Sequence, residues 1–114
     1  MDIPTASVSG LPDPLPEGLL VLDVREDEEW EAGHVEGSQH VPMMELGQRY
    51  AELAEMFGGE QTLVVCRVGN RSAYAAAFLI QQGVDAVNLE GGLVAWARAG
   101  RPLVTDDDRP PSVL

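Results

Sequence analysis

The chain has 114 residues and a formal net charge of −12, with nineteen Asp and Glu against seven Arg and no Lys. This length predicts one domain with a buried core. The acidic balance argues against nucleic acid and anionic membranes as partners, because both require basic patches. We see no membrane-spanning run and no signal peptide. A single cysteine, Cys66, excludes an internal disulfide and a cysteine-rich metal site, which predicts a reduced, cytoplasmic protein.

Predicted strands and helices alternate along the chain. Residues 1–18 are a proline-rich N-terminal extension in which only a short edge strand, Ala6–Val8, is expected. Apolar runs, helical periodicity and terminating glycines predict strands at 19–23, 39–41, 63–66 and 84–89, and helices at 25–33, 43–57, 71–82 and 92–99. Such alternation is typical of an α/β domain with a mostly parallel sheet, here over residues 19–104.

Two further expectations concern a helix face and the end of the sequence. In the helix expected at 71–82, one apolar face is formed by Tyr74, Ala75, Phe78 and Leu79. The segment 105–114 is acidic and then proline-containing, so we expect a loose tail.

The segment Cys66–Ser72 is the strongest candidate for a functional site, because it joins a buried strand to a helix. In open α/β sheets, sites lie beyond the carboxyl ends of the strands. Loop N–H groups beside a helix N-terminus bind anions and stabilise a thiolate, and Gly69 permits the tight turn that this requires. A lone cysteine ending an apolar strand is also a common structural thiol. Two arginines and a glycine in the loop favour the reactive thiolate.

This loop resembles the active-site loop of single-domain rhodanese-like sulfurtransferases. Other family signatures follow in the same order: Leu22–Arg25, Glu29–Trp30, Gly33–Gly37, Val41–Pro42, Leu89–Trp96 and Gly100–Pro102. The resemblance covers about residues 19–104. It implies a five-stranded, mostly parallel sheet flanked by helices.

The resemblance also implies a persulfide mechanism. The Cys66 thiolate would attack the outer sulfur of thiosulfate or of a persulfide donor, and then pass that sulfur to cyanide or a thiol. The negative persulfide would be held by the loop, which consists of Arg67, Val68, Gly69, Asn70, Arg71 and Ser72. The resemblance implies neither a cofactor nor a metal. The implied partners are a small anionic donor and a thiol or cyanide acceptor, with a protein sulfur acceptor as a further candidate.

Loop length separates this resemblance from related phosphatases. Four residues lie between Cys66 and Arg71, one fewer than in phosphatase loops that enclose a tetrahedral phosphate. A cysteine phosphatase or arsenate reductase is therefore disfavoured. The alternative that remains is a sulfur-carrier or partner-docking module with weak activity on small donors. Val68 stands where the family usually has a small polar residue, which puts turnover rate and donor preference in question.

Charged residues near the loop are candidate supports. Asp23 ends a buried strand at the sheet edge expected to hold Cys66, and would bind Arg71 or Arg25 by a charge-assisted hydrogen bond, or cap its own loop. Arg67 would attract the donor anion, or be a solvated surface residue. Arg71 is expected to lock the loop rather than contact substrate.

Histidine and tryptophan side chains are assigned structural roles. His34 lies between two glycines and is interpreted as a hydrogen-bonding residue rather than a catalytic base. Trp30 and Trp96 are expected to be packing anchors.

Overall fold

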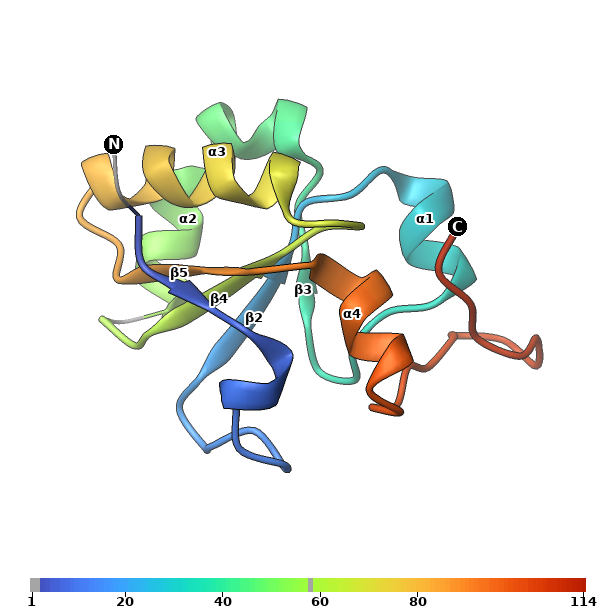
Figure 1. Cartoon of the computed structure of the whole chain (residues 1–114). Coiled ribbons are helices and arrows are strands. Elements are labelled where there is room, and N and C mark those ends of the chain that lie inside the picture. The colour runs from blue at the N-terminus through green and yellow to red at the C-terminus, as the bar shows by residue number, and fades with distance from the viewer. Residues whose placement is uncertain (1–2, 58) are drawn as a thin grey trace.

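The structure is a computed structural model that describes the backbone of residues 3–57 and 59–114. Its strands are β1 (Thr5–Ala6), β2 (Leu20–Asp23), β3 (Gln39–His40), β4 (Thr62–Val65) and β5 (Ala86–Leu89). Its helices are η1 (Val8–Gly10), α1 (Asp27–Ala32), η2 (Met43–Glu45), α2 (Leu46–Phe57), α3 (Asn70–Gln81) and α4 (Gly92–Arg98). The strands form one sheet in the order β1-β5-β4-β2-β3, with parallel neighbours throughout (Figure 1). The predicted α/β fold is confirmed.

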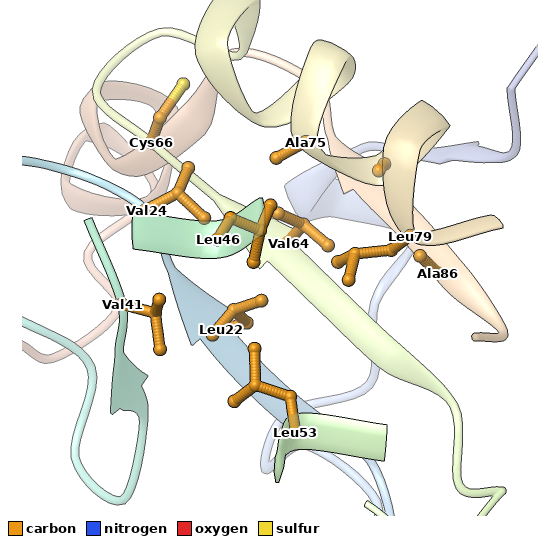
Figure 2. Packing of buried hydrophobic residues seen from close by; sticks show 11 residues of the cluster. Leu22, Val24, Val41, Leu46, Leu53, Val64, Cys66, Ala75, Leu79 and Ala86 are labelled. Atoms are coloured by element: carbon orange, nitrogen blue, oxygen red, sulfur yellow. The ribbon is translucent and has the colours of Figure 1, made fainter. Parts of the chain in front are cut away.

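Helices cover both faces of the sheet, which explains the continuous apolar runs of its central strands. Alternate side chains of a strand point to opposite faces. Leu22 and Val64 belong to the core under α2 and α3, whereas Val21 and Leu63 belong to the core under α4. Figure 2 shows the first of these cores, with Cys66 at its end beyond β4 and its sulfur directed toward the start of α3.

Several elements differ from their predicted positions. The edge strand expected at Ala6–Val8 lies at Thr5–Ala6, and the chain then turns into η1. Tyr74, expected on the apolar face of α3, has a side chain that is 74% exposed. The buried positions of α3 are Ser72, Ala75, Ala76 and Leu79, which are spaced i, i+3, i+4 and i+7. Tyr74 lies outside this face and points to solvent.

The C-terminal segment, drawn in red in Figure 1, runs back to α1. Val104 pairs with His34 in an isolated antiparallel bridge, and the Ser112 amide donates to the Ala32 carbonyl at 2.8 Å. At Gly33 the segment passes so close that an added Cβ atom would lie 2.6 Å from the Ser112 carbonyl oxygen. The tail expected to be loose therefore makes specific contacts with the domain.

The expected structural roles of His34 and Trp30 agree with their contacts. Nδ1 of His34 lies 2.8 Å from the Trp30 carbonyl oxygen, and the two rings stack at 3.6 Å between centroids. Trp96 is buried in the core under α4. None of the helices in residues 3–57 and 59–114 combines the length and the apolar composition that crossing a bilayer demands.

Candidate active site

The Cys66 thiol lies at the carboxyl edge of the sheet, directly after β4, and is 1% exposed. Its Sγ atom accepts hydrogen bonds from the backbone N–H groups of Gly69, at 3.1 Å, and Ser72, at 3.3 Å. The Ser72 hydroxyl oxygen lies 3.2 Å from the same sulfur. The loop and the first turn of α3 thus wrap around a single sulfur atom. Because peptide N–H groups and a helix N-terminus stabilise negative charge, this geometry suits a thiolate.

Glycine at position 69 makes this wrapping possible. Gly69 has φ = 100°, in the left-handed region, and is the N-cap of α3. An added Cβ atom would lie 3.2 Å from both the Gly91 nitrogen and the Leu89 carbonyl oxygen. Only glycine adopts this conformation at low cost, so the tight turn predicted at Gly69 is present.

The start of α4 supports the loop from the other side. The N–H group of Leu93 donates to the Cys66 carbonyl at 2.9 Å, and that of Val94 donates to the Arg67 carbonyl at 3.0 Å. The two segments approach so closely at Gly92 that a Cβ atom there would lie 2.5 Å from both carbonyl oxygens. The glycine pair before α4 is therefore a direct support of the Cys66 loop.

Behind the loop lies a residue that sequence reasoning missed. Asn88, on β5, is 7% exposed. Its Nδ2 donates to the Gly69 carbonyl at 3.2 Å, and its Oδ1 accepts from the Ser72 hydroxyl at 2.5 Å. A polar amide inside the apolar run 84–89 is the signal that could have found it, because buried polar groups in folded proteins are almost always hydrogen-bonded.

Arg71 is held by Glu29 rather than by Asp23. Its two terminal nitrogens donate to the two Glu29 carboxylate oxygens at 2.7 and 2.9 Å, and Glu29 also accepts from the Glu26 amide at 3.0 Å. The Arg71 hydrogen bonds are the main reason that the pKa of Glu29 falls from the usual 4.5 to about 2, and Glu29 in turn raises the pKa of Arg71. The ion pair ties the start of α3 to α1. Glu29 belongs to one of the family signatures, but the sequence alone does not reveal this role.

Asp23 instead binds Arg25, one of the two partners considered for it. Both side chains are fully buried, with Arg25 Nη2 2.7 Å from Asp23 Oδ2. Asp23 Oδ1 also accepts from the Arg25 backbone amide at 3.0 Å, so it caps its own loop as well. Arg25 Nη2 further donates to the Gly33 carbonyl at 2.7 Å. The hydrogen bonds made by the Asp23 and Arg25 side chains stabilise the turn between β2 and α1.

Three predicted loop residues face outward. Arg67 is exposed, and its Nε donates to the Leu114 carbonyl at 2.6 Å. Val68 is 42% exposed, and Asn70 is exposed at the first position of α3. The structure thus brings Gly69 and Ser72 to the sulfur, places Arg71 in an ion pair, and leaves Arg67, Val68 and Asn70 on the surface of the loop.

Comparison with known proteins agrees with this architecture. Residues 8–99 match the Rhodanese-like domain, so the chain belongs to the rhodanese-like family. A protein of Allochromatium vinosum named "Sulfurtransferase" is 36% identical over 92 residues, which are 80% of this chain and 83% of that protein.

Solved structures show the same fold. A rhodanese-related protein from Thermoplasma volcanium superimposes with a TM-score of 0.82 at 33% identity, over 91% of this chain and 100% of that one. A thiosulfate sulfurtransferase from Pseudomonas aeruginosa gives a TM-score of 0.74 at 26% identity, over 93% of this chain but only 21% of that one. The domain architecture therefore occurs both in short proteins and within longer ones.

The contact between Gly92 and the Cys66 loop leads to a first prediction. Gly92→Ala should lower the free energy of unfolding by about 1–3 kcal/mol, because its Cβ atom would overlap two backbone carbonyls. Alkylation of the buried Cys66 should also become faster. Gly100→Ala is the matched control, since Gly100 has φ = 79° but open space around the Cβ position. If urea unfolding showed that both variants lose the same free energy of unfolding, close packing of Gly92 against the loop would be contradicted.

The Glu29–Arg71 pair predicts a pH dependence of stability. The pKa of Glu29 is depressed in the folded state, so its ionised form contributes stability above the usual 4.5, and this contribution is lost as the pH falls toward about 2. Glu29→Gln should therefore lower the free energy of unfolding at neutral pH. The difference in this free energy between the variant and wild type should disappear as the pH falls from 4.5 to about 2. Glu28 is exposed on the same helix, so Glu28→Gln should have the same free energy of unfolding as wild type at every pH. If Glu29→Gln remained less stable than wild type at a pH of about 2, the role of the ion pair would be refuted.

Proposed function

We propose that this protein is a sulfurtransferase that carries a sulfane sulfur as a persulfide on Cys66. The donor is thiosulfate or another persulfide, and the acceptor is cyanide or a thiol. The observation that carries the proposal is the convergence of the Gly69 and Ser72 N–H groups on the sulfur of the chain's one cysteine. The sulfurtransferase names of a relative and of a structural neighbour support it.

The proposed reaction has two steps. The Cys66 thiolate attacks the outer sulfur of thiosulfate, the new S–S bond forms as the old one breaks, and sulfite leaves with the electron pair. Cyanide then attacks the outer sulfur of the persulfide, and thiocyanate leaves while the Cys66 thiolate is regenerated. When the acceptor is a thiolate, it takes the sulfur and becomes a persulfide. A thiolate formed in advance removes the need for a general base.

The size of the loop favours sulfur over phosphate. The N–H groups of Gly69 and Ser72 lie 3.1 and 3.3 Å from Sγ itself, so the loop closes directly on the cysteine. A phosphatase loop must instead be wide enough to enclose a whole phosphate group beyond the cysteine sulfur. The short spacing between Cys66 and Arg71 therefore supports sulfur transfer. We also assign the protein to a reducing compartment such as the cytoplasm, since its one thiol must stay free.

A second candidate function is a sulfur-carrier or partner-docking module with weak activity on small donors. It is favoured by exposed apolar side chains in the Cys66 loop and in the helix that follows it. Val68 is 42% exposed in the Cys66 loop, and Tyr74, one turn into α3, is 74% exposed. A small anion makes no use of such surface, whereas aromatic side chains are enriched where proteins bind one another.

The proposed function predicts the effect of replacing the thiol. Cys66→Ser should abolish the transfer of sulfur from thiosulfate to cyanide, because a hydroxyl is far less acidic than a thiol and forms no persulfide. Circular dichroism should show an unchanged fold, since serine is nearly the same size. Transfer near the wild-type rate would overturn the proposal.

The docking alternative predicts an effect of Tyr74 that depends on the acceptor. The test acceptor is a synthetic peptide with one cysteine flanked by leucines, compared with cyanide under the same conditions. Tyr74→Ser should reduce transfer to the peptide several-fold and leave transfer to cyanide unchanged. Gln81→Ser, exposed at the other end of α3, is the control and should change neither. Equal rates for wild type and Tyr74→Ser with the peptide would remove the case for docking at this surface.

A further inference from the structure

The buried Asn88 amide has a fixed orientation behind the Cys66 loop. Its Nδ2 faces the Gly69 carbonyl oxygen at 3.2 Å, and a carbonyl oxygen can only accept a hydrogen bond. Oδ1 is therefore the atom that faces Ser72, whose hydroxyl donates to it at 2.5 Å. The same hydroxyl oxygen lies 3.2 Å from Cys66 Sγ. Asn88 thus reaches the thiol through one intermediate hydroxyl group.

The Ser72 hydroxyl has one proton and two neighbours that compete for it. While the proton lies on the Asn88 side, Ser72 Oγ meets Cys66 Sγ only as an acceptor. A Cys66 thiol can donate its S–H to that oxygen, but a thiolate has no proton to donate. To give the thiolate a third hydrogen bond, the hydroxyl must turn away from Asn88. That rotation leaves the buried Oδ1 atom without a donor, which is costly.

We propose that Asn88 is a positioning residue that controls the ionisation of Cys66 by competing with it for the Ser72 proton. Its part in catalysis rests on the proposed function. In the persulfide, the negative charge lies on the outer sulfur, and Sγ becomes an uncharged, divalent atom that needs no third donor. The Ser72 proton can then remain with Asn88. The amide therefore favours the sulfur-loaded form of Cys66 over the free thiolate.

Other charges also act on the thiol, and they stay constant in the test. The groups on the surrounding elements are Arg71 of α3 with its partner Glu29 of α1, the Asp23–Arg25 pair after β2, and the exposed Arg67 and Glu90 in the adjoining loops. Substitutions at Asn88 and Ser72 leave all of them in place. Any change that requires both Asn88 and Ser72 is then assigned to the shared proton.

The experiment is a double-mutant cycle that measures the pH midpoint of Cys66 alkylation by iodoacetamide. Asn88→Leu removes the competing acceptor and frees the hydroxyl for the thiolate. We expect the midpoint to fall by about one pH unit, a tenfold change in the ratio of thiolate to thiol. In a Ser72→Ala background, Asn88→Leu should cause no further shift. An equal shift in both backgrounds, or none in either, would overturn the proposal.

Asn88→Asp provides an independent comparison and guards against a folding defect in the leucine variant. Both substitutions remove the donor to the Gly69 carbonyl, but aspartate keeps an acceptor for Ser72 and adds negative charge. The midpoint should therefore rise in Asn88→Asp and fall in Asn88→Leu, in protein shown to be folded by circular dichroism. Shifts in the same direction would mean that Asn88 acts only by anchoring Gly69. A fall in Asn88→Asp would by itself overturn the proposal.

A loading measurement connects the cycle to sulfur transfer. At a pH above the alkylation midpoints of both proteins, where free Cys66 is thiolate, and with thiosulfate and sulfite at a fixed ratio, Asn88→Leu should lower the ratio of persulfide to free Cys66 by about tenfold, because it stabilises the free thiolate. An unchanged or higher ratio would overturn the inference. Failure of the proposed function is recognised separately, because sulfur transfer by Cys66→Ser would refute that function and leave the alkylation cycle intact.

Discussion

The hydrogen bonds that Gly69 and Ser72 donate to the Cys66 sulfur are the interaction on which the rest of the site depends. They require the chain to close on the sulfur within seven residues of the end of β4, with Gly69 in a left-handed conformation. Four other elements hold the closed loop. α3 continues directly from it, α4 donates to its carbonyls, β5 supplies Asn88, and α1 supplies Glu29. A small parallel sheet can bring these groups together because its carboxyl ends share one edge.

This arrangement assigns the stabilisation of negative charge mainly to the backbone. Arg71, which the sequence predicted would lock the loop rather than contact substrate, forms a two-point ion pair with Glu29 at the start of α3. Arg67 is directed toward the Leu114 carbonyl on the surface. The N–H groups and the helix N-terminus lie closest to the sulfur, and their field is fixed by the fold. The chain has a net charge of −12, and salt screens its distant carboxylates more strongly than donors in contact with the sulfur.

Much of the fold could be predicted because it is encoded locally. Apolar runs mark the buried strands, glycines mark the ends of helices, and the spacing from Cys66 to Arg71 marks the loop. The supports of the loop escape prediction because they join residues far apart in the sequence. Glu29 and Arg71 are 42 residues apart, and Ser72 and Asn88 are 16 apart. The sequence does not decide the partner of Asp23 for a related reason, since only packing determines which arginine it reaches.

The central claim is that Cys66 itself becomes the carrier of the transferred sulfur. Mass spectrometry of the intact protein after incubation with thiosulfate, followed by peptide mapping, tests this most directly. The account predicts an added mass of one sulfur atom, located on the peptide that contains Cys66 and removed by cyanide. Protein that gains no sulfur from thiosulfate or from a low-molecular-weight persulfide, or that carries the sulfur on another residue, would contradict it.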